Sequence, residues 1–173
     1  MRVYAPATPT ELDRLRRDGS WLPSAGAFAV TPALRGWVTA DGPADDEELE
    51  LVALSEAARH SLRLLGPLVQ PEQARRVVLA LDVDPGVVEI GDEGADDPPG
   101  RVRLAIAGPV PLARIASLHV DEDTAGRAVA SAAAAVSAAD DGDPDAEAVV
   151  SALDDHELLW YHPAELAGLT GGA

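Results

Sequence analysis

RVVLALDVD, residues 76–84, is an almost unbroken apolar run that is rich in branched side chains. Such a run is typical of a central β-strand whose two faces are both covered. Pro85 and Gly86 follow it directly and predict a turn. We therefore expect this strand in the middle of a sheet, with helices packed against it.

Two shorter strands precede the central one, and each leads into a helix that begins with proline. Residues 2–6 and 26–30 are the predicted strands. The sequence TPTE at residues 8–11 has the form of a capping box with proline at the first helical position, and Gly19 predicts where that helix ends. The Thr-Pro pair at residues 31–32 begins the second helix in the same way.

The longest predicted helix covers roughly residues 45–65. Acidic residues crowd its first turns, Arg59 and Arg63 lie near its end, and Gly-Pro at residues 66–67 ends it. Its apolar side chains fall on one face at helical spacing: Leu51, Leu54, Ala58, Leu62 and Leu65. The spacing predicts an amphipathic helix.

Strands and helices alternate irregularly in the rest of the chain. We expect a surface loop at residues 91–100, strands at 101–106, 117–120 and 158–161, an alanine-rich helix ending near 140, a short helix at 145–153 and a third proline-started helix from 163. No Gly-x-Gly-x-x-Gly follows a predicted strand, which argues against a doubly wound dinucleotide fold. We predict a single α+β domain over residues 1–173, with a mixed or antiparallel sheet of about five to six strands packed against three to five helices.

The chain is strongly acidic, with a formal net charge of −17 at pH 7. Because affinity for nucleic acids and anionic membranes comes largely from clustered basic side chains, we expect neither as a partner. The sequence has no cysteine, which excludes disulfides, thiolate nucleophiles and sulfur-ligated metal sites, and no lysine, which excludes Schiff-base chemistry. It shows neither a secretory signal pattern nor a membrane-spanning run, so we expect a cytoplasmic protein.

Residues 154–162, DDHELLWYH, form the densest group of chemically capable side chains. On an extended strand His156, Trp160 and His162 point the same way, so we regard them as ligand-binding candidates. The alternative interpretation is that Trp160 and Tyr161 belong to the core, and that the acids and histidines mark the solvated ends of a strand.

Two other groups have both a functional and a structural interpretation. Arg35, with the arginines late in the long helix, could form an anion pocket at a helix N-terminus, or these cations could offset helix dipoles and pair with carboxylates. His119, Asp121 and Asp123 could bind a divalent cation, or the acids could cap the helix that follows. We expect no metal and no cofactor.

Six segments spread over most of the chain carry a family resemblance. They are MRVY with Pro6 and Thr8, AFAVTPALR at 27–35, AARHSLRLL at 57–65, VPLA at 110–113, HVD at 119–121 and DHELLWY at 155–161. Together they resemble an uncharacterised family of actinobacterial proteins. The resemblance implies a GC-rich, non-halophilic, cytosolic source, and it brings no activity because that family is one of unknown function.

A smaller set of segments is similar to the ADP-ribosyltransferase-like fold. Tyr4 with Thr8, VTP at 30–32, VDP at 83–85 and GPVP at 108–111 occupy the corresponding places. This likeness implies a small nucleotide or NAD site that includes Tyr4 and Thr31. The chain departs from the pattern because its first strand offers only Arg2 as a cation and no Glu stands beside Gly108.

The function is therefore unknown from the sequence, and two hypotheses remain. The first is a domain that binds a protein partner or associates with itself; the alternative is a small NAD-binding enzyme of the ADP-ribosyltransferase-like class. No catalytic residue is assigned. The candidate ligand-binding residues are Tyr4, Thr31, Arg35, His156, Trp160 and His162.

Overall fold

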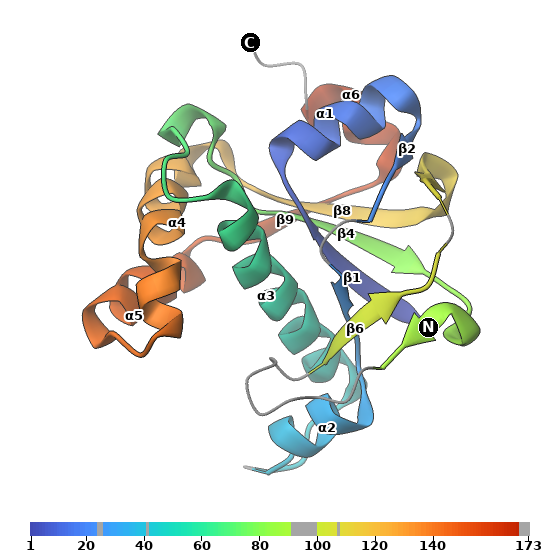
Figure 1. Ribbon diagram of the computed structural model, residues 1–173, viewed down its shortest axis with the longest axis horizontal. Coiled ribbons are helices and arrows are strands. Elements are labelled where there is room, and N and C mark those ends of the chain that lie inside the picture. The colour runs from blue at the N-terminus through green and yellow to red at the C-terminus, as the bar shows by residue number, and fades with distance from the viewer. Residues whose placement is uncertain (24–25, 41, 91–99, 107, 170–173) are drawn as a thin grey trace.

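A seven-stranded antiparallel sheet forms the centre of the structure, in the order β5-β6-β3-β1-β4-β8-β9, and β2 pairs separately with β7 (Figure 1). The computed structural model describes residues 1–23, 26–40, 42–90, 100–106 and 108–169. The strands are β1 (Arg2–Ala7), β2 (Ser20–Trp21), β3 (Ala27–Phe28), β4 (Val77–Asp82), β5 (Val88–Glu89), β6 (Arg101–Leu104), β7 (Val110–Pro111), β8 (Ile115–Asp121) and β9 (Leu158–Tyr161).

Strand β4 confirms the prediction made from residues 76–84, since its residues 77–81 are all buried. It lies between β1 and β8 and pairs antiparallel with both. The β1 register runs from Arg2 opposite Asp82 to Ala7 opposite Val77. The N-terminal strand therefore lies inside the sheet, and its apolar character on both faces follows from that position.

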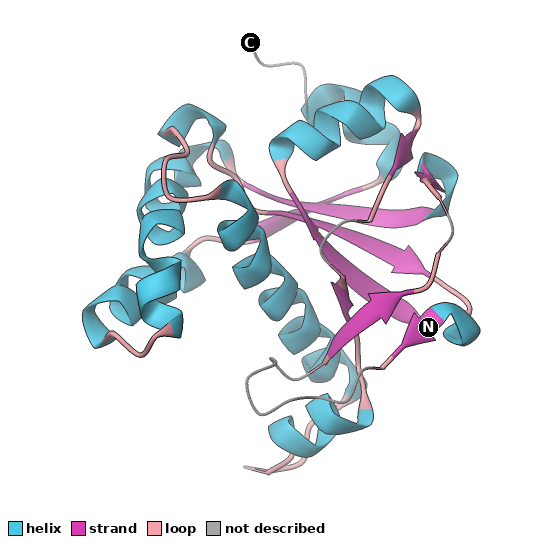
Figure 2. Ribbon diagram, viewed as in Figure 1, coloured by secondary structure: helices cyan, strands magenta, loops and turns pink. Residues whose placement is uncertain are grey.

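Helices cover both faces of the sheet, as the colours of Figure 2 make visible. The α-helices are α1 (Pro9–Asp18), α2 (Pro32–Val38), α3 (Asp46–Leu65), α4 (Gly126–Asp140), α5 (Pro144–Ser151) and α6 (Leu166–Leu169). Single 3-10 turns are η1 (Pro71–Gln73), η2 (Pro85–Val87), η3 (Leu112–Arg114), η4 (Asp123–Ala125), η5 (Ala152–Asp155) and η6 (Pro163–Glu165).

Alternate residues of the central strands pack against different helices. Val3 and Leu79 lie in one cluster with Leu12 and Leu15 of α1 and Leu166 of α6. The other face carries a separate cluster, in which α3 contributes its alanines; its strand residues are Tyr4, Phe28, Val78 and Ala80. This division follows the period of two along a strand, and it confirms the α+β class.

The predicted helix starts are confirmed in atomic detail. The Thr8 hydroxyl accepts the backbone N–H of Glu11, and the Glu11 carboxylate accepts the backbone N–H of Thr8. Gly19 ends α1 in the left-handed conformation, at φ 67°. Helix α3 begins with a second capping box, between Asp45 and Glu48. These bonds satisfy backbone donors that the first turn of a helix leaves free.

The start of the apolar stripe of α3 faces a different direction from Ala53 and Ala57, whereas Ala58 and Leu62 of the same stripe are buried. Ala53 and Ala57 pack on the sheet, whereas Leu51 is 62% exposed and Leu54 is half-buried. The stripe predicted from the sequence therefore exists, but it turns along the side of α3 toward α5 and the start of β9. Small side chains on the sheet side let α3 approach the strands closely.

Gly126, the first residue of α4, lies against the η1 turn. A Cβ atom at this position would lie 2.2 Å from the carbonyl oxygen of Pro71. Helix α4 then packs with α5 and the end of α3 in a cluster that includes Leu62, Val129 and Leu153. The absence of a side chain at residue 126 is what allows this close approach of helix and turn.

Other expectations differ from the structure in detail. The sheet has one strand more than the upper expectation, because the two-residue strand β5 was not predicted. The third proline-started segment forms a 3-10 turn and four residues of α-helix. The surface loop expected at residues 91–100 lies outside the described residues except for Gly100. Among the described helices, none combines the length and apolarity that crossing a membrane requires.

Gly126→Ala is expected to lower the free energy of unfolding by about 1–3 kcal/mol, because the new methyl group would collide with the backbone of η1. The matched control is Gly36→Ala in α2, where a Cβ meets no atom within 4 Å. That change should be neutral or slightly stabilising. Urea unfolding of both variants provides the measurement, and equal stability of the two would contradict the packing described for Gly126.

Candidate functional site

A groove of about 510 Å³ runs between α3, α5 and the residues that lead into β9. Its apolar lining comes from all three segments and includes Leu51, Leu54, Leu62, Val150, Leu153 and Leu158. Leu158 and Leu54 pack against the same cluster beneath α3. The groove therefore has an apolar wall that the predicted stripe of α3 supplies.

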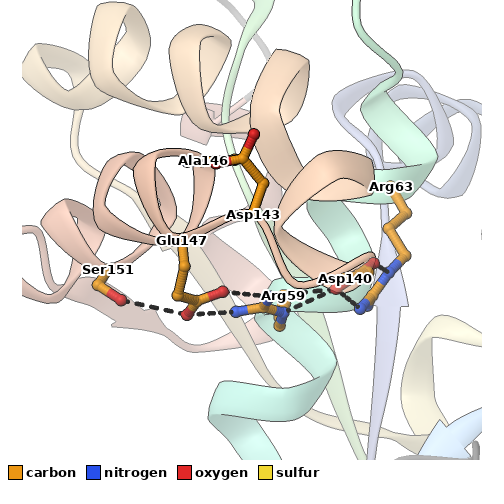
Figure 3. Close-up of polar contacts among 7 residues, drawn as sticks. All are labelled: Arg59, Arg63, Asp140, Asp143, Ala146, Glu147 and Ser151. Atoms are coloured by element: carbon orange, nitrogen blue, oxygen red, sulfur yellow. Dashed lines mark hydrogen bonds and ion pairs between the residues drawn. The ribbon is translucent and has the colours of Figure 1, made fainter.

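Arginine–carboxylate pairs join α3 to the end of α4 and to α5 (Figure 3), and Arg59 and Glu147 of this set line the groove. The Arg59 Nη2 atom lies 2.8 Å from Glu147 Oε2 and 3.1 Å from Asp140 Oδ1, and Arg63 Nε lies 2.7 Å from Asp140 Oδ2. The Ser151 hydroxyl adds a hydrogen bond to Glu147. These bonds attach α5 and the end of α4 to α3, and they occupy the guanidinium of Arg59.

A buried ion pair lies beside the groove, and one of its two members, Arg76, is part of the lining. Asp121 is 1% exposed and accepts hydrogen bonds from the Arg76 guanidinium at 2.7 Å and from the Arg76 backbone N–H at 2.6 Å. The same guanidinium donates to the carbonyl oxygen of His156 at 2.9 Å. Arg76 therefore offers the groove little free charge, although its side chain contributes to the lining.

Three carboxylates that line the groove have no hydrogen bond or ion pair among the described residues: Glu56, Asp154 and Glu157. Burial raises the pKa of Glu56, and the charges of Arg59 and Arg63 work against that rise. Since both arginines of the lining are already paired, the free charge of the groove is negative. An acidic groove with an apolar wall suits a ligand that is both cationic and apolar.

Beside the groove, polar and aromatic side chains cross the face of the sheet that α3 covers only in part. The Tyr4 hydroxyl donates to Glu50 of α3 at 2.9 Å, and burial, together with this bond, raises the pKa of Tyr4 to about 12. The Tyr4 ring meets His119 edge-on, and the His119 Nε2 atom lies 3.1 Å from the Ser117 hydroxyl. Burial lowers the pKa of His119.

Trp160 continues this row at the edge of the sheet. It lies opposite His119 in the β8–β9 register, contacts the ring of His162 and is 60% exposed. Leu158 is two residues earlier and so shares its face of β9. The exposed indole and the groove are therefore parts of one continuous surface.

The structure separates the six candidate residues. Tyr4, Trp160 and His162 lie along the sheet face, and His156 lines the groove, where its Nδ1 atom lies 3.2 Å from Glu122 Oε1.

Thr31 and Arg35 are placed elsewhere, in and before α2. Thr31 is 1% exposed, and its hydroxyl caps α2 by accepting the N–H of Leu34. Arg35 pairs with Asp46 at the start of α3. Neither residue lines the groove.

The residues considered for a divalent cation are also apart. Asp121 pairs with Arg76, and Asp123 pairs with Arg75 at 2.6 Å. Across residues 1–169, excluding the undescribed positions, no group of three or more metal-binding side chains is present.

Sequence reasoning missed Glu56 and the exposure of Leu51. The signal for Leu51 was present in the helical stripe, but the sequence does not reveal which element packs against that stripe. Glu56 lies one turn before Arg59, which suggests an ion pair within the helix. The structure instead directs Arg59 to Glu147 and Asp140, and the carboxylate is left without a salt bridge.

Comparison with known proteins identifies one family. The model of a family of unknown function, DUF6912, matches residues 1–170. No curated protein and no solved structure matches the chain.

Asp140→Asn is expected to lower the free energy of unfolding by about 1 kcal/mol at pH 7. Partial burial works to raise the pKa of Asp140, but hydrogen bonds from Arg63 and Arg59 outweigh it and hold the pKa below its ordinary value. A lowered pKa means that the contribution is present above the ordinary aspartate pKa and is lost as the pH falls through the folded-state value.

The effect of the substitution should therefore shrink as the pH is lowered to 3, as measured by urea unfolding at both pH values. The neighbouring Asp141→Asn is the control, because Asp141 has no side-chain ion pair among the described residues. A pH-independent loss in Asp140→Asn would contradict an ionic role for this carboxylate.

Proposed function

The chain belongs to the DUF6912 family of unknown function, and we propose that it is a protein-interaction domain that binds a basic, partly apolar segment of another protein in the groove between α3 and α5. The observation that carries this proposal is the composition of the groove. Its free charges are the carboxylates of Glu56, Asp154 and Glu157, and they line the same groove as a set of leucines of which Leu51 is exposed.

Apolar exposure supports a macromolecular partner. Leu51 and Trp160 are 62% and 60% exposed, and the half-buried Leu54 and Leu158 lie between them. Aromatic and aliphatic side chains that are exposed together and rimmed by polar groups are a mark of interaction sites. Tryptophan in particular is enriched among the residues that contribute most to binding.

Charge favours a basic partner over a second copy of the same chain. Two copies would each bring a net charge of −17, and both would present the same unpaired carboxylates to one another. Like charges at an interface oppose association, whereas lysine or arginine on the partner would pair with these groups. The same carboxylates oppose a nucleotide, whose phosphates are anionic, so we prefer a protein partner to NAD. We place the encounter in the cytoplasm of an actinobacterial cell, in keeping with the expectation from the sequence.

Selection from a phage-displayed library of random 12-residue peptides tests the proposal. We expect the enriched peptides to combine at least two lysine or arginine residues with leucine, isoleucine or aromatic residues. Their affinity should fall as NaCl is raised from 0.05 to 0.5 M, because salt screens exposed charge pairs. Enrichment of acidic peptides, or of none, would contradict the proposed function.

Two leucine variants then locate the binding surface. Leu51→Ser should weaken the selected peptides about tenfold, since it removes apolar contact without disturbing the core. Leu68→Ser is the matched control, because Leu68 is 87% exposed but does not line the groove. Light scattering should give a monomer; a dimer that Leu51→Ser dissociates would show that self-association occupies this surface and would overturn the proposal.

A further inference from the structure

We infer that the bound segment leaves the groove as an extended chain and pairs with the free edge of β9, adding a strand to the sheet. This inference rests on the proposed function, since it concerns the same partner segment. Glu157 and Leu158 line the groove, and Leu158 is also the first residue of β9. A chain that lies in the groove is therefore directed onto the edge of the sheet.

Strand β9 is the last strand of the sheet in the part of the chain that the structure describes, and the hydrogen-bonding pattern shows which of its backbone groups point away from β8. The backbone N–H of Asp121 donates to the Arg76 carbonyl, so the backbone N–H and C=O groups of Asp121 point toward β4. Along an antiparallel strand, the backbone groups of successive residues point alternately to the two neighbouring strands. Those of Val120 therefore point toward β9 and bond its register partner Leu159. It follows that Leu158 and Trp160 direct their N–H and C=O groups away from β8, toward the open side.

The β9 edge is only four residues long, and it lacks the charges, proline and bulge that usually protect an edge strand. Residues 158–161, LLWY, contain no charge and no proline, and their pairing with β8 is regular, without a bulge. Leu159 and Trp160 are exposed on opposite faces of the strand. Natural proteins normally block an exposed edge with charges, proline or a bulge, because the edge is a template for another strand. An unblocked, strongly β-forming edge indicates that a strand pairs with it in the working protein.

The charge around β9 indicates which molecule supplies the added strand. Residues 154–165 contain Asp154, Asp155, Glu157 and Glu165 but no arginine or lysine. A second copy of β9 would bring the same four carboxylates beside them. A basic segment would instead place its cations next to these acids while its backbone bonds Leu158 and Trp160, so the occupant is the basic partner rather than another copy of this chain.

The sharpest test compares two substitutions of one residue. Trp160→Ala removes the indole and keeps the backbone N–H, whereas Trp160→Pro removes both. Because the N–H of Trp160 points away from β8, proline at this position leaves the β8–β9 bonds in place. The probe is the tightest peptide from the selection described above, with its affinity measured by calorimetry.

We expect Trp160→Pro to bind the peptide at least tenfold more weakly than Trp160→Ala, and we expect peptide binding to slow hydrogen exchange at the amides of residues 158 and 160. Methylation of alternate backbone nitrogens in the peptide should weaken its binding to the wild-type protein to a similar extent, and this arm does not depend on the folding of a variant. Equal affinity of the two variants, with unmethylated and methylated peptides binding alike, would overturn strand addition. If Leu51→Ser still weakened peptide binding in that case, the proposed function would stand and only strand addition would fail. If no peptide bound the wild-type protein, the proposed function and strand addition would both fail.

Discussion

The rest of the structure depends on the buried ion pair between Arg76 and Asp121. The two residues lie at adjacent ends of β4 and β8, and the Arg76 guanidinium also holds the His156 carbonyl just before β9. Breaking a buried pair of this kind costs roughly 3–5 kcal/mol, because the remaining charge has no compensation. The pair therefore connects the ends of β4 and β8 with the residue before β9, and Arg76 and His156 of this set line the groove.

Arginines act as connections between elements throughout this acidic chain. The 13 arginines face 30 acidic residues, and pairs such as Arg2–Asp82, Arg35–Asp46 and Arg59–Glu147 each join two different elements. Every arginine used in this way is unavailable to the surface around it. The groove is acidic for this reason: its own arginines are paired, Arg59 with Glu147 and Arg76 with Asp121, and three other carboxylates of its lining have no such partner among the described residues.

Features that depend on neighbouring residues could be predicted from the sequence, and features that depend on distant ones could not. The Thr8–Glu11 capping box, the end of α1 at Gly19 and the central strand β4 all follow from short patterns. The Thr-Pro pair at residues 31–32 also predicted that Thr31 caps a helix, whereas the likeness to the ADP-ribosyltransferase-like fold suggested that it binds a ligand. The pairing of residues 76 and 121 spans 45 positions, and only the packed structure reveals that Leu51 is exposed and that β9 lies at an edge. Of the residues in and beside the groove, His156 and Trp160 were expected from the sequence and Glu56 was not, and the ligand-binding role of all three stays a prediction.

The location of β1 inside the sheet has a consequence for the order of folding. Arg2 bonds Asp82 across 80 residues, so β1 stays unpaired on that side until β4 has been synthesised. Non-local pairing of this kind slows folding and favours a late, cooperative step. Strands β8 and β9 are synthesised later still, so the edge left open in the finished domain belongs to the last strand of the sheet to leave the ribosome.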